Sequence, residues 1–117
     1  VPQVFEKKGT WYSLFCTANN HYSEEQTSLR PVVTGNHYLI GDSPCGPWRI
    51  APGFLDGTQP CTRYAARIVD TDDGMVILGF ADRPNGIDFI GHIMDPDPVE
   101  ITEDGHLIIP PKLKAAE

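Results

Sequence analysis

Three side chains with complementary hydrogen-bonding chemistry lie close together near the middle of the chain: Asp56, Arg63 and Tyr64. The aspartate offers acceptors, the arginine a fork of donors, and the tyrosine a ring edge with a hydroxyl. A few such groups in a concave site are enough to orient a ligand rich in hydroxyl groups. The alternative is that they pair with other polar groups of the fold. We keep both interpretations, with ligand contact as the hypothesis to test.

A fourth candidate binding residue, His21, lies in a polar segment that runs from Thr17 to Thr34. This segment is too long for a plain turn and too uneven for an assured helix, and loops of this length tend to be functional or mobile. His21, followed by Tyr22, could reach a small ligand; otherwise it is a surface histidine. We expect at most one short helical turn here, between Asn19 and Leu29.

The remaining ionisable groups match no catalytic or metal-binding motif. The run around Asp72 lacks the spacing of a calcium loop with its distant Glu, so a solvated hairpin turn is favoured. The histidines show no H-x-x-x-H or H-x-H spacing, and no phosphate or dinucleotide fingerprint occurs, so we expect neither a metal nor a cofactor. Five further acids lie among prolines and a turn glycine and suit exposed loop ends: Asp95, Asp97, Glu100, Glu103 and Asp104.

Composition excludes several classes of partner. The 117 residues include 9 Lys and Arg and 16 Asp and Glu, so the net charge is −7. Nucleic acids and anionic membranes would be repelled, and we expect neither as a partner. The hydrophobic share of 40% is enough for a packed core. Three cysteines without a C-x-x-C pair favour buried, reduced thiols over a disulfide with one thiol left over.

The elements that must position the candidate residues are short strands, because apolar residues alternate with a period of two and no window carries a helical stripe. Residues 2–6 and 10–16 form one predicted hairpin. Residues 62–69 and 75–80 form a second, across a turn whose Asp-Gly pair supplies the positive φ that such turns need.

The segments after the two hairpins resemble each other. Residues 35–50 can be laid over residues 86–101 at a constant offset of 51, so that Tyr38 matches Phe89. A repeat of about 50 residues, each of four short strands, is typical of propeller blades. We therefore predict an all-β, antiparallel fold in which a single domain contains two four-stranded propeller-type blades, at about 1–51 and 60–109. The alternative is an eight-stranded β-sandwich or barrel.

Several stretches in this order resemble the later blades of five-bladed propeller glycoside hydrolases of the invertase, fructanase, arabinanase and β-xylosidase group. Residues 1–15 look like the start of one blade, and residues 38–48 are similar to the strand pair that carries Gly-Pro-Trp in this group. Residues 63–80 look like the next blade, and residues 95–107 like the segment that closes the domain. The resemblance covers nearly the whole chain and implies carbohydrate as the ligand.

The same resemblance assigns no catalytic residue to this chain. In those enzymes three carboxylates come from successive blades, and the general acid stands just before a strand that looks like Pro2–Phe5. The resemblance therefore implies a hydrolase-related propeller portion that is inactive on its own. It places Asp56, Arg63 and Tyr64 at the start of the innermost strand of the second blade, facing the funnel. Replacing Arg63 by Ala is then expected to remove weak sugar binding and to leave the fold intact.

The second functional hypothesis is a non-enzymatic binding or assembly module that completes its sheets by oligomerising. Two blades alone leave a blade face and several strand edges exposed, which is an aggregation hazard unless they are covered. We therefore expect either a homo-oligomer, most simply a two-fold dimer, or further N-terminal blades.

Overall fold

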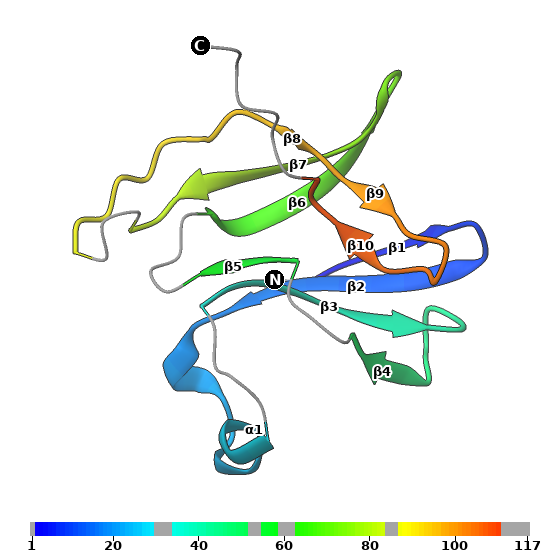
Figure 1. Ribbon diagram of the computed structural model, residues 1–117, viewed down its shortest axis with the longest axis horizontal. Coiled ribbons are helices and arrows are strands. Elements are labelled where there is room, and N and C mark those ends of the chain that lie inside the picture. The colour runs from blue at the N-terminus through cyan, green and yellow to red at the C-terminus, as the bar shows by residue number, and fades with distance from the viewer. Residues whose placement is uncertain (1, 30–33, 52–54, 59–62, 84–86, 111–117) are drawn as a thin grey trace.

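The computed structural model describes residues 2–29, 34–51, 55–58, 63–83 and 87–110. In this part of the chain the fold is all-β and antiparallel, as predicted, with two sheets face to face and a small hairpin along one side (Figure 1). The strands are β1 (Gln3–Lys7), β2 (Thr10–Thr17), β3 (Thr34–Gly41), β4 (Trp48–Ile50), β5 (Asp56–Thr58), β6 (Arg63–Thr71), β7 (Gly74–Ala81), β8 (Asp97–Pro98), β9 (Glu100–Ile101) and β10 (Leu107–Ile108).

The sheets differ from the predicted four strands each. The first sheet has five strands in the order β1-β2-β3-β4, with β5 beside the start of β3, because two short strands share the outer side of β3. The second sheet has three strands in the order β6-β7-β8. Strand β9 does not join this sheet and pairs with β10. The strand β8 is short because Pro96 and Pro98 lack the N–H groups that a longer ladder needs.

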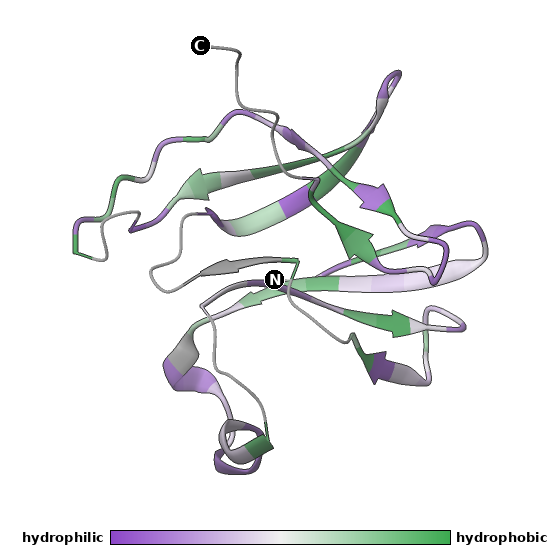
Figure 2. Ribbon diagram, in the orientation of Figure 1, coloured by the Kyte–Doolittle hydropathy of each residue, from purple (hydrophilic) through white to green (hydrophobic). Residues whose placement is uncertain are grey.

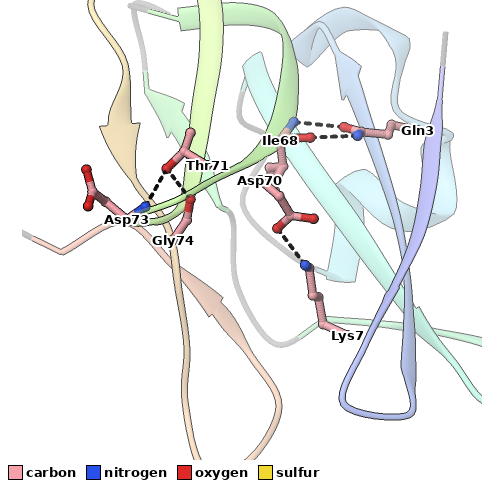
Figure 3. Close-up of polar contacts among 7 residues, drawn as sticks. All are labelled: Gln3, Lys7, Ile68, Asp70, Thr71, Asp73 and Gly74. Carbon is pink, nitrogen blue, oxygen red and sulfur yellow. Dashed lines mark hydrogen bonds and ion pairs between the residues drawn. The ribbon is translucent and has the colours of Figure 1, made fainter.

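Both predicted hairpins are confirmed. Lys8 and Gly9 between β1 and β2 have φ values of 53° and 83°, the two consecutive positive angles of a type I′ turn. At the second turn the hydroxyl of Thr71 accepts a hydrogen bond from the N–H of Asp73 (3.2 Å) and donates one to the carbonyl of Gly74 (2.7 Å; Figure 3). Local turn chemistry therefore sets the register of both strand pairs.

The polar segment after β2 contains two short helices, one more than predicted. These are the 3₁₀ turn η1 (Asn19–His21) and α1 (Glu24–Leu29). Ser23 precedes α1 and its hydroxyl accepts a hydrogen bond from the N–H of Gln26 (3.1 Å), so it caps the first turn. Neither of the described helices is long and apolar enough to cross a membrane.

The core lies between the two sheets. Alternate residues of β2 and β3 point inward, and Tyr12 and Leu14 are completely buried. They meet Ile68 of β6 and the fully buried Ile77 of β7. Figure 2 shows the hydrophobic stretches of β7 and β10 that supply part of this layer.

The hairpin of β9 and β10 is anchored on the first sheet. Its Leu107 is 2% exposed. The hydroxyl of Tyr12 donates to the carbonyl of Gly105 (2.7 Å), and the hydroxyl of Tyr38 both accepts from the N–H of Leu107 (3.1 Å) and donates to its carbonyl (3.4 Å). Burial raises the pKa of both tyrosine hydroxyls. The neighbouring Tyr38 raises the pKa of Tyr12 further, whereas the Leu107 hydrogen bond opposes the rise for Tyr38.

The two halves differ where their sequences were matched. Tyr38 is 4% exposed in the middle of β3, whereas Phe89 is 60% exposed and lies outside the strands. Residues 91–94 run alongside β7. The N–H of Met94 donates to the carbonyl of Gly79 (2.9 Å), and the N–H of Gly91 donates to the carbonyl of Ala81 (2.7 Å). The internal repeat stays a sequence prediction.

Candidate functional site

The candidate site lies at the start of β6, where the start of β3, strand β5 and the end of β7 also meet, on the left in Figure 1. Asp56, the first residue of β5, lies opposite Asn36 of β3 in the strand register. Asn36 in turn contacts the backbone of β6 on both sides of Tyr64. The fold therefore brings the backbone of Asp56 close to Arg63 and Tyr64, as a shared binding site requires.

A β-bulge shapes this end of β6. The register with β7 shifts between Tyr64 and Arg67, and Ala65 has a φ of 53°. A non-glycine residue in this conformation costs about 1 kcal/mol or more, and bulges of this kind are common beside active sites. The bulge turns backbone groups away from the ladder, so they need partners elsewhere.

Asn36 supplies those partners. Its side chain is completely buried; Nδ2 donates to the carbonyl of Arg63 (3.2 Å) and Oδ1 accepts from the N–H of Ala66 (3.2 Å). One amide thus gives two backbone groups beside the bulge their hydrogen-bond partner. The first sheet therefore fixes the conformation of the strand that carries Tyr64.

Arg63 is held inside the fold. It is 4% exposed, and its guanidinium forms an ion pair with the carboxylate of Asp97 on β8. Between them lies Gly79 of β7, where a Cβ would come within 2.7 Å of the Arg63 Cγ. The arginine stem therefore crosses β7 above a residue that must be small, and it links all three strands of the second sheet.

Two expectations change because of this ion pair. Asp97 was expected at an exposed loop end, but it is 8% exposed in β8, since the arginine draws it into the sheet interior. The expectation that Arg63→Ala leaves the fold intact is not supported, because that change would leave Asp97 buried without a counter-charge. Arg63 positions the site and is not open to solvent.

Tyr64 lies on the opposite face of the second sheet and is partly exposed. Its ring meets that of Phe80 edge to face, with centroids 6.1 Å apart, and Phe80 meets Phe89 in the same way at 5.7 Å. We call these three residues the aromatic row. Partly exposed rings beside polar groups are the usual lining of small-ligand sites.

His21 is exposed at the end of η1. The next residue, Tyr22, packs edge-on against His37 with centroids 6.0 Å apart, and His37 stacks on Phe15 at 5.7 Å. Since His37 is the neighbour of Asn36, these contacts tie the segment to the same end of the molecule. No described contact joins His21 itself to Tyr64.

Sequence reasoning missed Asn36 and misplaced Asp97. A signal for Asn36 was present, because it occupies an inward-facing position that alternates with the buried Tyr38 and Ile40. A polar side chain at such a position needs buried partners. Asp97 carried no signal, since flanking prolines are typical of loops as well as of edge strands.

Among the described residues, no group of three or more His, Cys, Asp or Glu side chains could hold a metal ion. Cys16 and Cys45 are free thiols. Cys16 is partly buried, but Cys45 is exposed in the turn between β3 and β4, so the prediction of a buried thiol is wrong there. The third cysteine, Cys61, lies outside the described residues.

Comparison with known proteins identifies the fold. No known family profile and no curated protein matches the sequence. The solved structure of the GH43 BlXynB protein from Bacillus licheniformis superposes with a TM-score of 0.64 and 24% identity. The match covers 92% of this chain and 21% of that chain, so the chain spans about a fifth of that protein. The antiparallel sheets are thus arranged as in part of a GH43 propeller.

Proposed function

We propose that this chain is a portion of a glycoside-hydrolase-related propeller that associates with carbohydrate and does not hydrolyse it alone. The observation that carries the proposal is the superposition on the GH43 protein over 92% of the chain. The candidate site supports it. Asn36 holds the start of β6, which presents the partly exposed Tyr64 beside β5, the strand that begins at Asp56.

Sugar contact is assigned to the aromatic row and to Asp56, with His21 at the margin. The Tyr64 ring offers a flat apolar face and its hydroxyl a donor and an acceptor. Arg63 acts indirectly: its ion pair with Asp97 and the Asn36 bonds fix where β6 begins. Because Arg63 itself is turned into the fold, we expect weak binding.

The placement of the described carboxylates supports the proposed lack of hydrolysis. Glycoside hydrolysis needs two carboxyl groups about 5 to 9.5 Å apart, one of them protonated. The buried carboxylate among the described residues, Asp97, is neutralised by Arg63. The turn acids, such as Asp72 and Asp104, are exposed. None of these offers an acid and a base across a bound sugar.

A turnover assay tests this directly. The purified chain is incubated with nitrophenyl glycosides of several pentoses and hexoses, and release of nitrophenol is measured. We expect no release above the buffer rate. Release that disappears on replacing one aspartate or glutamate of this chain by its amide would overturn the proposal of inactivity.

Calorimetric titration with xylo- and arabino-oligosaccharides tests the site itself. Tyr64→Ala should abolish the binding heat, whereas Tyr64→Phe should keep most of it if the ring face makes the contact. Ile50→Ala, at an exposed position on the first sheet, is the matched control and should bind as the native chain does. Equal loss in Tyr64→Ala and Ile50→Ala, or unchanged binding in Tyr64→Ala, would remove this site from the proposal.

The second candidate function is a non-enzymatic binding or assembly module. One observation favours it: large apolar side chains beside β7 are strongly exposed, including Ile93 at 70% and Phe89 at 60%. Monomeric proteins rarely expose contiguous apolar patches of this kind without a use for them.

A further inference from the structure

The outer face of the first sheet carries both tryptophans of the chain. Trp11 of β2 and Trp48 of β4 lie on either side of Gly41 of β3, because both pair with it in the strand register. Trp11 precedes the inward-pointing Tyr12, so its side chain points away from the core. Residues directly opposite each other in antiparallel strands share a face, so Trp48 points the same way. We call Trp11, Gly41 and Trp48 the tryptophan row.

Two glycines seat the Trp48 ring. A Cβ at Gly41 would come 2.7 Å from Trp48 Cε3, and a Cβ at Gly46 would come 3.0 Å from Cδ1. The six-membered part of the indole therefore lies against β3, and the five-membered part lies against the turn before β4. Contacts at both ends hold the ring in one orientation before a ligand arrives, which lowers the entropic cost of binding.

This end of the outer face is open to solvent in the described part of the chain. Both indoles are partly exposed, and in the next row across the sheet Val4 is 47% exposed and Ile50 54%. At the other end of the same face, Tyr22 packs against His37. Since neighbouring strands lie about 4.8 Å apart, the backbones of the two tryptophans are about 10 Å apart. The row is therefore wide enough for more than one sugar ring.

Polar groups border the tryptophan row on both sides. The exposed Glu6 lies opposite Trp11 and accepts a hydrogen bond from the N–H of Gly9 through Oε1 (2.8 Å). Beyond Trp48, Arg49 Nη1 lies 3.3 Å from the Asp42 carboxylate, with side chains that are 60% and 71% exposed. Aromatic rings beside exposed donors and acceptors suit a ligand that presents apolar C–H faces rimmed by hydroxyl groups.

The charges around the row favour a neutral ligand. Beside the row the strands and turns of the first sheet carry two acids and two bases, Glu6, Asp42, Lys8 and Arg49. Lys7 points the other way and pairs with Asp70 of β6. Helix α1 has two further acids, but its segment packs at the opposite end of the face. These balanced charges give no attraction for a polycation, and the net charge of −7 repels polyanions.

We propose that the tryptophan row binds the surface of an insoluble, uncharged polysaccharide, with sugar rings stacked on Trp11 and Trp48. Chains in a solid are already ordered and lose little conformational freedom on binding, whereas a soluble oligosaccharide loses more. The row therefore holds the solid and binds short soluble sugars too weakly to measure. The inference rests on the proposed association with carbohydrate. It adds a second surface at the end of β3, whereas the candidate site lies at the start of β3.

Co-sedimentation of the purified chain with microcrystalline cellulose tests the proposal. The native chain should leave the supernatant as the amount of cellulose increases. Trp48→Ala and Trp11→Ala should each weaken binding by about 10-fold or more, as truncation of a central tryptophan does at other binding surfaces. Trp48→Phe keeps a flat ring and should lose less. Circular dichroism verifies the fold of each variant.

Gly41→Ala tests the geometry of the row with both indoles kept. The added Cβ would meet the Trp48 ring, so the ring must move and binding should weaken. Two matched controls should bind cellulose as the native chain does: Ile93→Ala, which changes a side chain that is 70% exposed on the second sheet, and Tyr64→Ala, which changes the candidate site.

Three results would overturn the proposal. The native chain remains in the supernatant at every amount of cellulose, or Ile93→Ala weakens binding as much as Trp48→Ala, which would indicate general apolar adhesion. A native chain that ignores cellulose but binds a polyproline peptide through Trp48 would assign the row to proline-rich segments. Loss in Tyr64→Ala equal to that in Trp48→Ala would assign the polysaccharide to the candidate site. Calorimetry with soluble oligosaccharides tests Tyr64 separately, so failure of either site is seen independently of the other.

Discussion

The two ends of β6 each have an ion pair, and the pairs differ in their surroundings. At the start, Arg63 and Asp97 have side chains that are 4% and 11% exposed. At the end, Lys7 Nζ lies 2.5 Å from the Asp70 carboxylate, with side chains 31% and 66% exposed (Figure 3). Water can replace a lost partner at the end of the strand and cannot do so at its start. The buried ion pair therefore fixes the start of β6, whereas the exposed ion pair adds little to the stability of its end.

Side-chain amides extend this contrast along the strand. Gln3 of β1 donates to the carbonyl of Ile68 and accepts from its N–H, both at 2.8 Å (Figure 3). Asn36 makes the equivalent pair of contacts at the bulge, but in complete burial. The first sheet thus holds β6 through amides that take the place of ladder hydrogen bonds, most firmly at the candidate site.

The largest expected effect is that of Arg63→Ala. It leaves Asp97 buried without its partner, which should lower the free energy of unfolding by about 3 to 5 kcal/mol. Urea unfolding followed by circular dichroism measures the change. If the variant is too unstable to purify, Arg63→Met combined with Asp97→Leu removes both charges and should recover most of the stability. A loss below 1 kcal/mol in Arg63→Ala would mean that the pair is not buried in solution.

Asn36→Ala should have the next largest effect. It leaves the carbonyl of Arg63 and the N–H of Ala66 without the amide, and unsatisfied buried groups cost about 1 to 3 kcal/mol each. We expect a total loss of about 3 kcal/mol in urea unfolding, together with faster amide hydrogen exchange at Ala66. Gln3→Ala is the matched control: its contacts are only partly buried, so it should cost less. Equal losses would contradict the contrast between the two amides.

Tyr38→Phe should cost about 2 kcal/mol at neutral pH, because it leaves the buried N–H of Leu107 without the hydroxyl. Its effect should also depend on pH. Burial raises the pKa of Tyr12 and Tyr38 in the folded chain, whereas tyrosines of the unfolded chain titrate near pH 10. Their stabilisation is therefore complete below about pH 10 and is lost as the pH rises through the higher folded pKa values.

Thermal unfolding between pH 8 and pH 11 measures this dependence. The midpoint of the native chain should fall steeply above about pH 10, and the double variant Tyr12→Phe, Tyr38→Phe should fall less steeply. Parallel curves for the two proteins would show that other groups cause the alkaline loss.

The smallest expected effect is that of Lys7→Ala. An exposed ion pair contributes about 0 to 1 kcal/mol, and salt screens it. Urea unfolding at low salt should reveal a loss within that range that shrinks in about 0.5 M salt, where the Debye length is only a few ångströms. A loss as large as that of Arg63→Ala would erase the difference between the two ends of β6.

Much of the fold was predictable because it depends on local signals. Alternating apolar residues and the turns at Gly9 and Gly74 specify the two hairpins and the antiparallel sheets. Contacts between distant segments were not predictable: the Arg63 pairing with Asp97 joins residues 34 positions apart, and the Tyr38 anchor for Leu107 spans 69. No local pattern encodes which polar groups meet across two sheets.

The candidate site was predictable to a similar degree. The residue types at Asp56, Arg63 and Tyr64 selected the start of β6 as a candidate, and the register brings it beside β5 through Asn36. The roles of these residues depend on burial, which the sequence does not specify. Arg63 is buried between strands whereas Tyr64, its neighbour, is partly exposed, because adjacent residues of a strand point to opposite faces.

The most direct test of the account maps sugar binding along β6 by two-dimensional amide NMR. Xylo-oligosaccharides are titrated into the chain, and shifts are followed at both ends of the strand. The account predicts shifts concentrated at Tyr64, Ala66 and Phe80, at the braced start of the strand, with little change at Asp70 and Thr71. Shifts centred on Asp70 and Thr71, or no shifts at millimolar sugar, would contradict the claim that the start of β6 is the functional end of the molecule.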